Sequence, residues 1–316
     1  MNPFFSIIIP LFNKENEIKI TLESVLNQTF QDFEIIIVND GSTDNSKNIV
    51  ELFSNPKIKL ISTENNGVSK TRNLGIKAAK GELIAFLDAD DIWFKNHLQN
   101  LFQLYNLFPD CGIYATNYEL FYNKNKIIKP SFFDVPKENW CGIIEDFFKS
   151  SLVFRIAWTS AIAIPKKAFE KVGDFDENIT HGAGGEDTDL WIRMALEFKV
   201  AFNNQISARY NLVAENRISL TKTLTRSFPK LNNFEEQEIK NHSLKKYLDL
   251  YRTQYALKYK LAGDFKTFNF YKNQISLKNI TWKTKVLFML PVFVLKILFF
   301  TKKYLEQKNI LFSIYH

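Results

Sequence analysis

Residues 6–44 decide the fold class, and they read SIIIPLFNKENEIKITLESVLNQTFQDFEIIIVNDGSTD. Two β-branched runs in this stretch, Ser6–Ile9 and Glu34–Val38, lack the apolar and polar alternation of a half-exposed strand. Such continuous apolar runs are typical of parallel strands that helices cover on both faces. Between them, apolar residues recur at helical spacing from Ile18 to Leu26. A strand, a helix and a strand in this order predict a βαβ unit and a parallel sheet.

The same alternation continues along the chain. Further predicted elements are a helix through residues 49–52, a strand at 58–61, a helix at 71–79 and a strand at 83–87. The less regular middle third adds candidate strands at 113–115 and 161–164 and a helix at 190–198. From about Ser227 the pattern is mostly helical and basic. We therefore expect an α/β fold with a mixed, mainly parallel sheet flanked by helices, followed by a helical C-terminal extension.

The composition excludes several classes of protein. Hydrophobic residues make up 46% of the 316 residues and charged residues 24%, which excludes disordered, collagen-like and coiled-coil architectures. The formal net charge of +7 favours anionic partners such as phosphates, nucleic acid or acidic lipid. Only the stretch 240–260, rich in Lys and Tyr, supports a nucleic-acid partner, and we expect none. A P-loop kinase or ATPase is disfavoured because the chain lacks a Gly-rich run that ends in Gly-Lys-Ser/Thr.

The cysteines and the first residues indicate the cellular compartment. Cys111 and Cys141 lie far apart without Cys or His companions at metal-ligand spacing, which favours a reducing compartment over a disulfide framework or a zinc site. Residues 1–5 lead into the first apolar run without the basic region and cleavage site of a signal peptide. We expect a cytoplasmic protein.

Polar residues follow the predicted strands at the points where those strands end. Pro10–Asn13 follow the first strand, Asn39–Ser42 the second, and Asp88–Asp91 the fourth. Ligands of parallel α/β sheets bind outside the carboxyl ends of the strands, so these turns predict one site. Asp88 and Asp90 suit a hard cation that also takes phosphate oxygens, such as Mg²⁺ or Mn²⁺. The alternative is that Asp90 or Asp91 caps the helix that follows.

Several motifs, taken in order, resemble the family 2 glycosyltransferases of the GT-A fold over about residues 5–219. The motifs that carry this resemblance are Ser6–Asn13, Leu22–Thr29, Val38–Asp44, Gly67–Gly75, Leu87–Asp91 and Gly185–Arg193. The resemblance implies a GT-A domain over residues 1–225, with a nucleotide-sugar-binding half at 1–117 and an acceptor-binding half at 118–225. Residues 226–316 would form the helical, basic extension.

The resemblance also implies a set of donor-site residues. The donor would be a nucleoside diphosphate sugar, which we expect to be UDP-linked. The residues expected to contact it are Pro10, Phe12, Asn13, Asp40, Arg72, Asp88 and Ala89. Among these, Asp40 would accept a hydrogen bond from the base, and Arg72 would face the diphosphate with its fork of donors. Asp88 and Asp90 would hold the Mg²⁺ or Mn²⁺ ion.

The catalytic residues implied by the resemblance are Asp187 and Glu186. Asp187 would act as the general base that takes the proton of an acceptor hydroxyl, in a single displacement that inverts the anomeric configuration. The alternative is that these two carboxylates only cap the helix that they open. Trp191 and Arg193 are expected on the acceptor side, although core packing is the alternative for Trp191. Two departures from the family are Asn39, where a second Asp is common, and the Gly-rich residues 181–185, which form either a lid over the acceptor or a plain loop.

The apolar stretch 286–300 raises the question of a membrane. It is shorter than the roughly 20 residues that span a bilayer, and it contains Pro291 and Lys296. Flanking lysines suit a helix that lies in the interface of an anionic membrane. The alternative is a buried helix or an oligomer contact. A lipid-linked acceptor would explain a position at the inner face of the cytoplasmic membrane.

Two functions are compatible with these motifs. The first is an inverting glycosyltransferase that moves a sugar from a nucleoside diphosphate sugar to a hydroxyl of a glycan or lipid-linked acceptor, in the synthesis of a cell-surface polysaccharide. The second is a catalytically silent nucleotide-sugar scaffold or sensor of the same fold. The joint presence of Arg72, Asp88, Asp90 and Asp187 favours the enzyme.

Overall fold

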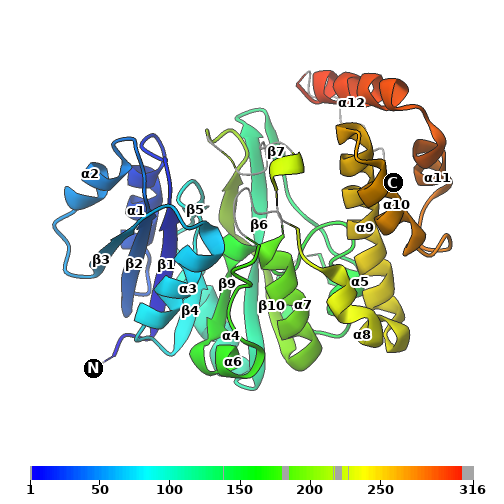
Figure 1. The fold of residues 1–316 in the computed structure, drawn as a ribbon. Helices are drawn as coiled ribbons and strands as arrows, with labels where there is room; N and C mark the ends of the chain where they lie inside the picture. The colour runs from blue at the N-terminus through cyan, green and yellow to red at the C-terminus, as the bar shows by residue number, and fades with distance from the viewer. Residues whose placement is uncertain are drawn as a thin grey trace. The chain divides into compact units, whose positions relative to one another are not determined.

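The computed structural model describes residues 2–137, 139–179, 185–215, 217, 223–226 and 228–307. The chain divides into two compact units (Figure 1). Unit 1 comprises residues 1–221 and 226–229, and unit 2 comprises residues 222–225 and 230–316.

The first half of the unit 1 sheet is parallel. Its strands are β1 (Phe5–Leu11), β2 (Phe33–Asp40), β3 (Ile58–Thr63) and β4 (Leu83–Phe86). They lie in the order β3-β2-β1-β4, because β2 and β3 are added on one side of β1 and β4 pairs with its other side. The carboxyl ends of β1, β2 and β4 therefore lie side by side, as the βαβ pattern predicts.

The second half of the sheet is mixed. It continues from β4 through β9 (Ile162–Pro165), β6 (Cys111–Asn123), β10 (Lys199–Asn211) and β5 (Ile92–Trp93). β9 is antiparallel to both β4 and β6, whereas β10 runs parallel to β6. Two short strands, β7 (Lys126–Ile128) and β8 (Cys141–Ile144), pair with β6 and β10. The sheet is thus mixed and mainly parallel, as expected, but β6 is much longer than the predicted residues 113–115.

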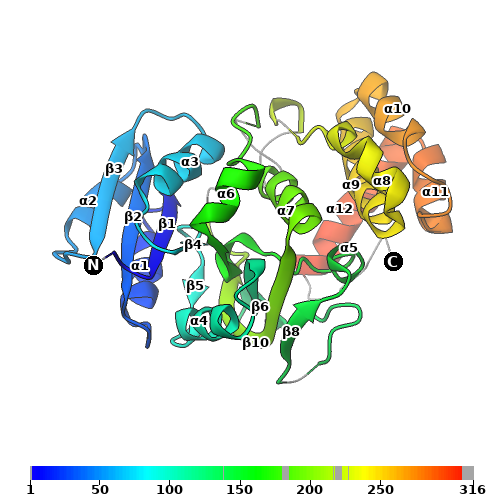
Figure 2. The same cartoon turned by 90° about the horizontal axis from the view of Figure 1, so that it is seen from below.

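Helices cover both faces of the sheet. The helices of unit 1 are α1 (Ile18–Leu26), α2 (Ser46–Glu51), α3 (Val68–Ala78), α4 (His97–Leu107), α5 (Phe147–Ser150), α6 (Lys166–Val172) and α7 (Glu186–Glu197), together with the 3₁₀ turn η1 (Thr159–Ala161). Figure 2 shows α1 and α4 on one face and α3, α6 and α7 on the other. Ile7, Ile8 and Ile9 are consequently all fully buried. Gly75 lets α3 approach β1, since a Cβ atom there would lie 2.5 Å from Cγ2 of Ile8.

Unit 2 is helical, as the sequence predicts. It contains α8 (Glu235–Lys240), α9 (His242–Ala262), α10 (Phe265–Asn273), α11 (Trp282–Met289) and α12 (Val292–Gln307), together with the turns η3 (Thr223–Thr225) and η4 (Leu231–Phe234). The stretch rich in Lys and Tyr forms α9, and its tyrosines 247, 251 and 255 are packed inside the unit. None of the helices within the described residues combines the length and the apolar character needed to cross a bilayer.

Buried charges hold unit 2 together. The guanidinium of Arg252 contacts Glu238 at 2.6 Å and Asp249 at 3.2 Å. The Lys260 ammonium donates to the carbonyl oxygens of Phe288 and Leu290, each at 2.7 Å. Lys260 therefore binds the C-terminal end of α11, where helix carbonyls lack partners within the helix.

Candidate active site

Asp40, the last residue of β2, organises the loop that leads into α3. Its carboxylate accepts hydrogen bonds from the backbone N–H groups of Asn66 at 2.7 Å and Gly67 at 3.0 Å. The neighbouring Gly41 has φ of 70°, and a Cβ atom there would lie 2.9 Å from the backbone nitrogen of Asn65. This close approach requires glycine. Asp40 thus stands at the predicted sheet edge, and its contact with a base stays a prediction.

The loop after β1 is tied to the turn after β2. The side-chain oxygen of Asn13 accepts the Thr43 N–H at 2.8 Å, and the Asn13 N–H donates to the Ser42 hydroxyl at 3.1 Å. Phe12 is 41% exposed, and Pro10 lies on the same strand end. These predicted donor-site residues therefore share one edge of the sheet, with an aromatic side chain open to solvent.

Arg72 on α3 joins two motifs that lie far apart in the sequence. Its Nη2 atom donates to Oδ1 of Asp88 at 2.8 Å, and its Nη1 atom donates to Oε1 of Glu186 at 2.7 Å. The Arg72 side chain is 4% exposed. Burial disfavours its charge, but the two carboxylates outweigh this cost and raise the pKa of Arg72. Arg72 thereby fixes the N-terminus of α7 next to the carboxyl end of β4.

The three aspartates after β4 have different surroundings. Asp88 keeps 31% of its side chain exposed. Asp90 forms an ion pair with Lys14 at 2.7 Å. Asp91 is fully buried and accepts hydrogen bonds from the Ser160 hydroxyl at 2.5 Å and from the Asn211 N–H at 3.0 Å. The N-cap position of the helix that follows, α4, is Asn96, so neither Asp90 nor Asp91 serves as its cap.

Burial perturbs the carboxylates of this turn. It raises the pKa of Asp90, and the nearby charge of Asp88 adds to the effect while the Lys14 ammonium opposes it. Burial also raises the pKa of Asp91 well above its usual range, with Asp90 and Asp88 contributing in the same direction. The hydroxyl of Thr21 donates to the carbonyl oxygens of Ala89 and Asp91, which fixes the turn from α1.

Glu186 and Asp187 open α7. The N-cap is Gly185, with φ of 106°, and Oε2 of Glu186 accepts its N–H at 3.2 Å. Burial and the charge of Asp187 raise the pKa of Glu186, whereas Arg72 opposes the shift. Asp187 accepts from Arg155 at 2.8 Å and from the Thr188 N–H at 2.6 Å. Each carboxylate accepts one backbone N–H at the start of α7, but the N-cap residue, Gly185, provides no side-chain cap, and Arg72 and Arg155 give Glu186 and Asp187 an arginine partner each.

The two residues expected on the acceptor side, Trp191 and Arg193, have partners within unit 1. Trp191 is 1% exposed and packs against Phe86 and Phe175, so the core-packing alternative describes it and the expectation of an acceptor contact is corrected. Arg193 binds Asp189 at 2.9 Å and donates to the Val172 carbonyl at 2.6 Å. Its guanidinium therefore anchors α7 to the end of α6. The Gly-rich approach at 181–184 lies outside the described residues.

A comparison with protein families decides the class of this site. The model of glycosyl transferase family 2 matches residues 6–173. The chain belongs to this family. It is therefore a glycosyltransferase, an enzyme class that transfers the sugar of a nucleotide sugar, and the matched region contains Asp40, Arg72 and the Asp88–Asp91 turn.

Curated relatives agree with this assignment. An uncharacterized glycosyltransferase of Rickettsia typhi is 29% identical over 239 residues, which are 75% of this chain and 70% of the relative. The glycosyltransferase GlyG of Streptococcus pneumoniae is 31% identical over 214 residues, which are 65% of this chain and 69% of the relative.

Solved glycosyltransferase structures share the fold. A crystal structure of S. aureus TarS, residues 1–349, in complex with UDP-GlcNAc has a TM-score of 0.57 at 18% identity, and covers 86% of this chain and 91% of TarS. The mannosyltransferase PcManGT of Pyrobaculum calidifontis, in complex with GDP-Man and Mn²⁺, has a TM-score of 0.54 at 16% identity. The match covers 87% of this chain and 74% of PcManGT. The family 2 chain thus has the GT-A fold.

Two carboxylates of the family 2 site fit a divalent ion. Within the described ranges, no group of three or more His, Cys, Asp or Glu side chains is placed to hold a metal ion. Mg²⁺ is commonly held by only one or two carboxylates together with substrate phosphates. Asp88 and Asp90 follow the end of β4; Asp88 pairs with Arg72 and keeps 31% of its side chain exposed, and Asp90 pairs with Lys14. This donor set fits Mg²⁺ or Mn²⁺ bound together with a diphosphate.

Sequence reasoning missed several residues that shape the site, namely Lys14, Arg155, Ser160 and Asn211. Their contacts join residues far apart in the chain, such as Ser160 to Asp91. Lys14 follows the Ser6–Asn13 motif directly, but a single lysine after a strand carries no distinctive signal.

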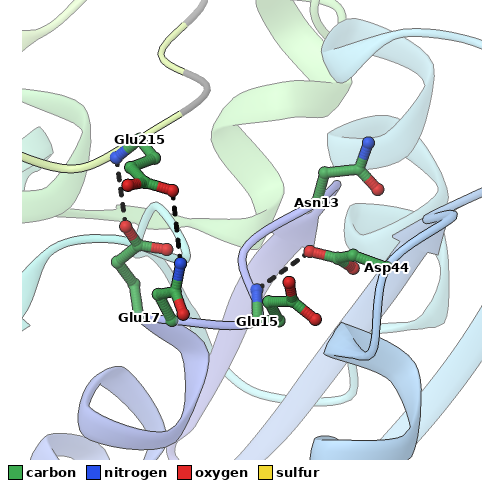
Figure 3. A pocket seen from close by; sticks show the side chains of 6 residues that line it. Asn13, Glu15, Glu17, Asp44 and Glu215 are labelled. Carbon is green, nitrogen blue, oxygen red and sulfur yellow. Dashed lines mark hydrogen bonds between the residues drawn. The ribbon is translucent and has the colours of Figure 1, made fainter.

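An acidic pocket lies beside the loop that follows β1 (Figure 3). It is lined by Asn13, Glu15, Asn16, Glu17, Asp44 and Glu215.

Proposed function

We propose that this family 2 enzyme transfers a sugar from a nucleoside diphosphate sugar, UDP-linked, to a hydroxyl of a glycan or lipid-linked acceptor in the synthesis of a cell-surface polysaccharide. One observation carries the proposal. Arg72 contacts Asp88 at 2.8 Å and Glu186 at 2.7 Å, and so brings the Asp-rich turn after β4 next to the carboxylates that open α7. A donor-binding group and a candidate base therefore share one site.

The donor would lie along the carboxyl ends of β1, β2 and β4. Pro10, Phe12 and Asn13 would border the base and ribose together with Asp40, since they share this edge. Asp88, Ala89 and Arg72 would contact the ribose and diphosphate. Solved structures of this fold hold either base, UDP-GlcNAc in TarS and GDP-Man in PcManGT, so the donor panel includes both. Residues 1–117 would then form the donor half of the domain and residues 118–225 the acceptor half.

Asp187 would act as the base of a single displacement. The acceptor oxygen attacks the anomeric carbon as the bond from that carbon to the diphosphate breaks, and a carboxylate oxygen of Asp187 takes the hydroxyl proton. The anomeric configuration inverts because attack and departure occur on opposite faces. Such a positioned base contributes about 10²–10⁴-fold to the rate. Glu186, held by Arg72, orients the segment that carries Asp187.

A Mg²⁺ or Mn²⁺ ion held by Asp88 and Asp90 would, when bound, neutralise charge on the departing diphosphate. Arg72 would contribute to the same task from the protein, because its guanidinium lies beside Asp88 at the end of β4.

The proposal is tested by measuring release of nucleoside diphosphate from a panel of uridine- and guanosine-linked sugars, with Mn²⁺ and with chelator. We expect wild type to use one donor with metal, and Asp90→Asn to lose this turnover. Calorimetry separates the remaining outcomes. Donor binding without turnover on any hydroxyl acceptor would favour the silent scaffold, and absence of donor binding would overturn the proposal.

We also propose that unit 2 contacts the inner face of the cytoplasmic membrane as a peripheral surface. α11 and α12 bury Leu287 and Leu295 inside the unit, but they leave Met289 81% and Phe293 67% exposed. Other exposed apolar residues of these helices are Trp282, Ile297, Leu298 and Phe300, and the helices carry lysines at 283, 285, 296 and 302. Apolar side chains with basic residues beside them suit an anionic bilayer surface.

Vesicle sedimentation tests this surface. We expect the protein to bind vesicles that contain anionic phosphatidylglycerol more strongly than phosphatidylcholine vesicles, and Met289→Glu with Phe293→Glu to abolish the difference. Ile239→Glu, compared with Met289→Glu alone, is the control for one added negative charge, since Ile239 on α8 is 84% exposed and lies outside the surface. Equal binding by the double variant and wild type would refute the membrane contact and favour an oligomer contact.

A further inference from the structure

The ammonium of Lys14 lies where a cation at Asp90 would lie. Lys14 follows β1 and is 9% exposed. Its Nζ atom contacts Oδ2 of Asp90 at 2.7 Å and the carbonyl oxygen of Glu215 at 2.5 Å. Its backbone N–H donates to the Ser46 hydroxyl at 2.7 Å, which fixes the residue in place. A carboxylate and a carbonyl oxygen are the ligand types that hard cations prefer, so Lys14 and a divalent ion compete for the same carboxylate.

The charges around the turn after β4 show what Lys14 neutralises. Arg72 is shared between Asp88 and Glu186. Asp91 faces the Ser160 hydroxyl and the Asn211 N–H in the interior. Lys14 therefore supplies the positive charge in contact with Asp90. A fixed positive charge beside a partly buried carboxylate weakens the attraction of that carboxylate for a second cation.

A divalent ion must overcome this fixed charge. A diphosphate brings further negative charge and oxygen ligands to the site, which compensates for the ammonium. We infer that Lys14 is the resting counter-ion of Asp90 and makes divalent-cation binding depend on the diphosphate of the donor. This inference rests on the proposed function, which assigns Asp88 and Asp90 to the metal. Lys14 is thus a positioning residue that couples the binding of metal and donor.

The experiment measures Mn²⁺ affinity by electron paramagnetic resonance, without nucleotide and with UDP. Lys14→Gln removes the charge but keeps an amide that can donate to Glu215. We expect Lys14→Gln to bind Mn²⁺ alone at least about tenfold more tightly than wild type, and Lys14→Arg to bind as weakly as wild type. Lys149→Gln is the control, because Lys149 pairs with Asp134 on the surface and its loss changes the net charge equally. Adding Asp90→Asn to Lys14→Gln should abolish the gain in Mn²⁺ affinity. This result would show that the ion binds at Asp90 and not in the acidic pocket of Figure 3.

Wild type alone provides a second measurement if Lys14→Gln does not fold. UDP should raise the Mn²⁺ affinity of wild type at least about tenfold. Equal Mn²⁺ affinity of Lys14→Gln and wild type would overturn the inference and leave the proposed function intact. A wild-type Mn²⁺ affinity that UDP does not change although UDP binds would overturn both the inference and the proposed role of the metal, but not donor binding. Absence of UDP binding by wild type under every metal condition would instead overturn the proposed function.

Discussion

Replacement of Arg72 by Met removes the contact that joins the two halves of the site. Glu186, with 11% of its side chain exposed, would lose its charged partner, whereas Asp88 at 31% would be partly solvated. Removing one partner of a buried ion pair costs about 3–5 kcal/mol, and the exposure of Asp88 places the expected loss of unfolding free energy near the lower end, at about 3 kcal/mol. UDP affinity should fall as well, because Arg72 faces the diphosphate in the proposed function.

Arg252→Met is the matched control. Arg252 is also buried and also contacts two carboxylates, Glu238 and Asp249, but it lies within unit 2. Urea unfolding and calorimetric titration with UDP are measured on both variants. We expect a similar stability loss in each and loss of UDP binding only in Arg72→Met, and adding Glu186→Gln should recover part of the stability but not the binding. Unchanged UDP affinity in Arg72→Met, or equal loss in Arg252→Met, would refute the reasoning.

Three further predictions concern the framework of the site and the extension. Burial lowers the pKa of His97 to about 3 from 6.5. Below about pH 6.5 the unfolded chain therefore binds a proton that the folded protein does not bind, and the free energy of unfolding decreases as the pH decreases. Wild type should therefore lose about 2 kcal/mol through this residue between about pH 8 and pH 5, and the loss should disappear in His97→Asn; an unchanged slope in urea unfolding would contradict this. Gly75→Ala should destabilise unit 1 by about 1–3 kcal/mol through its clash with Ile8, and Ile8→Ala should partly reverse the effect in a double-mutant cycle. Lys260→Met should lower the free energy of unfolding by about 1–3 kcal/mol, because the Phe288 and Leu290 carbonyls lose their donor. Amide hydrogen exchange in α11 should become faster, and unchanged exchange would contradict this role of Lys260.

The part of the fold that local patterns specify could be predicted from the sequence. β1, α1 and β2 follow directly from continuous apolar runs and helical periodicity, and their order fixes the parallel pairing. β10 could not be predicted, because its residues 199–211 mix polar and apolar side chains without a regular period. Its pairing with β6 depends on residues far away in the chain.

The candidate site shows the same division. Asp40 and the Asp88–Asp91 turn are predictable as parts of one site because β2 and β4 both flank β1 in parallel, so their carboxyl ends lie at the same edge of the sheet. The contact of Arg72 with Glu186 spans 114 residues, so no local pattern reveals it. Trp191 could be placed on a helix from the sequence, but its role could not be predicted. An aromatic side chain at helical spacing can pack in the core or contact a sugar, and only its burial distinguishes the two. Lys14 gives no signal at all, because its partner Asp90 lies 76 residues away.

In the proposed mechanism, Asp187 is the base in a site that Arg72 assembles. The most direct test compares Asp187→Asn with Asp189→Asn, a neighbouring carboxylate on α7 that instead pairs with Arg193. For each, calorimetry gives UDP-sugar affinity, and sugar transfer to an acceptor hydroxyl is followed under single-turnover conditions. We predict that Asp187→Asn binds the donor like wild type but transfers at least about 100-fold more slowly, while Asp189→Asn transfers normally. Transfer by Asp187→Asn at the wild-type rate would contradict the assignment of Asp187 as the base.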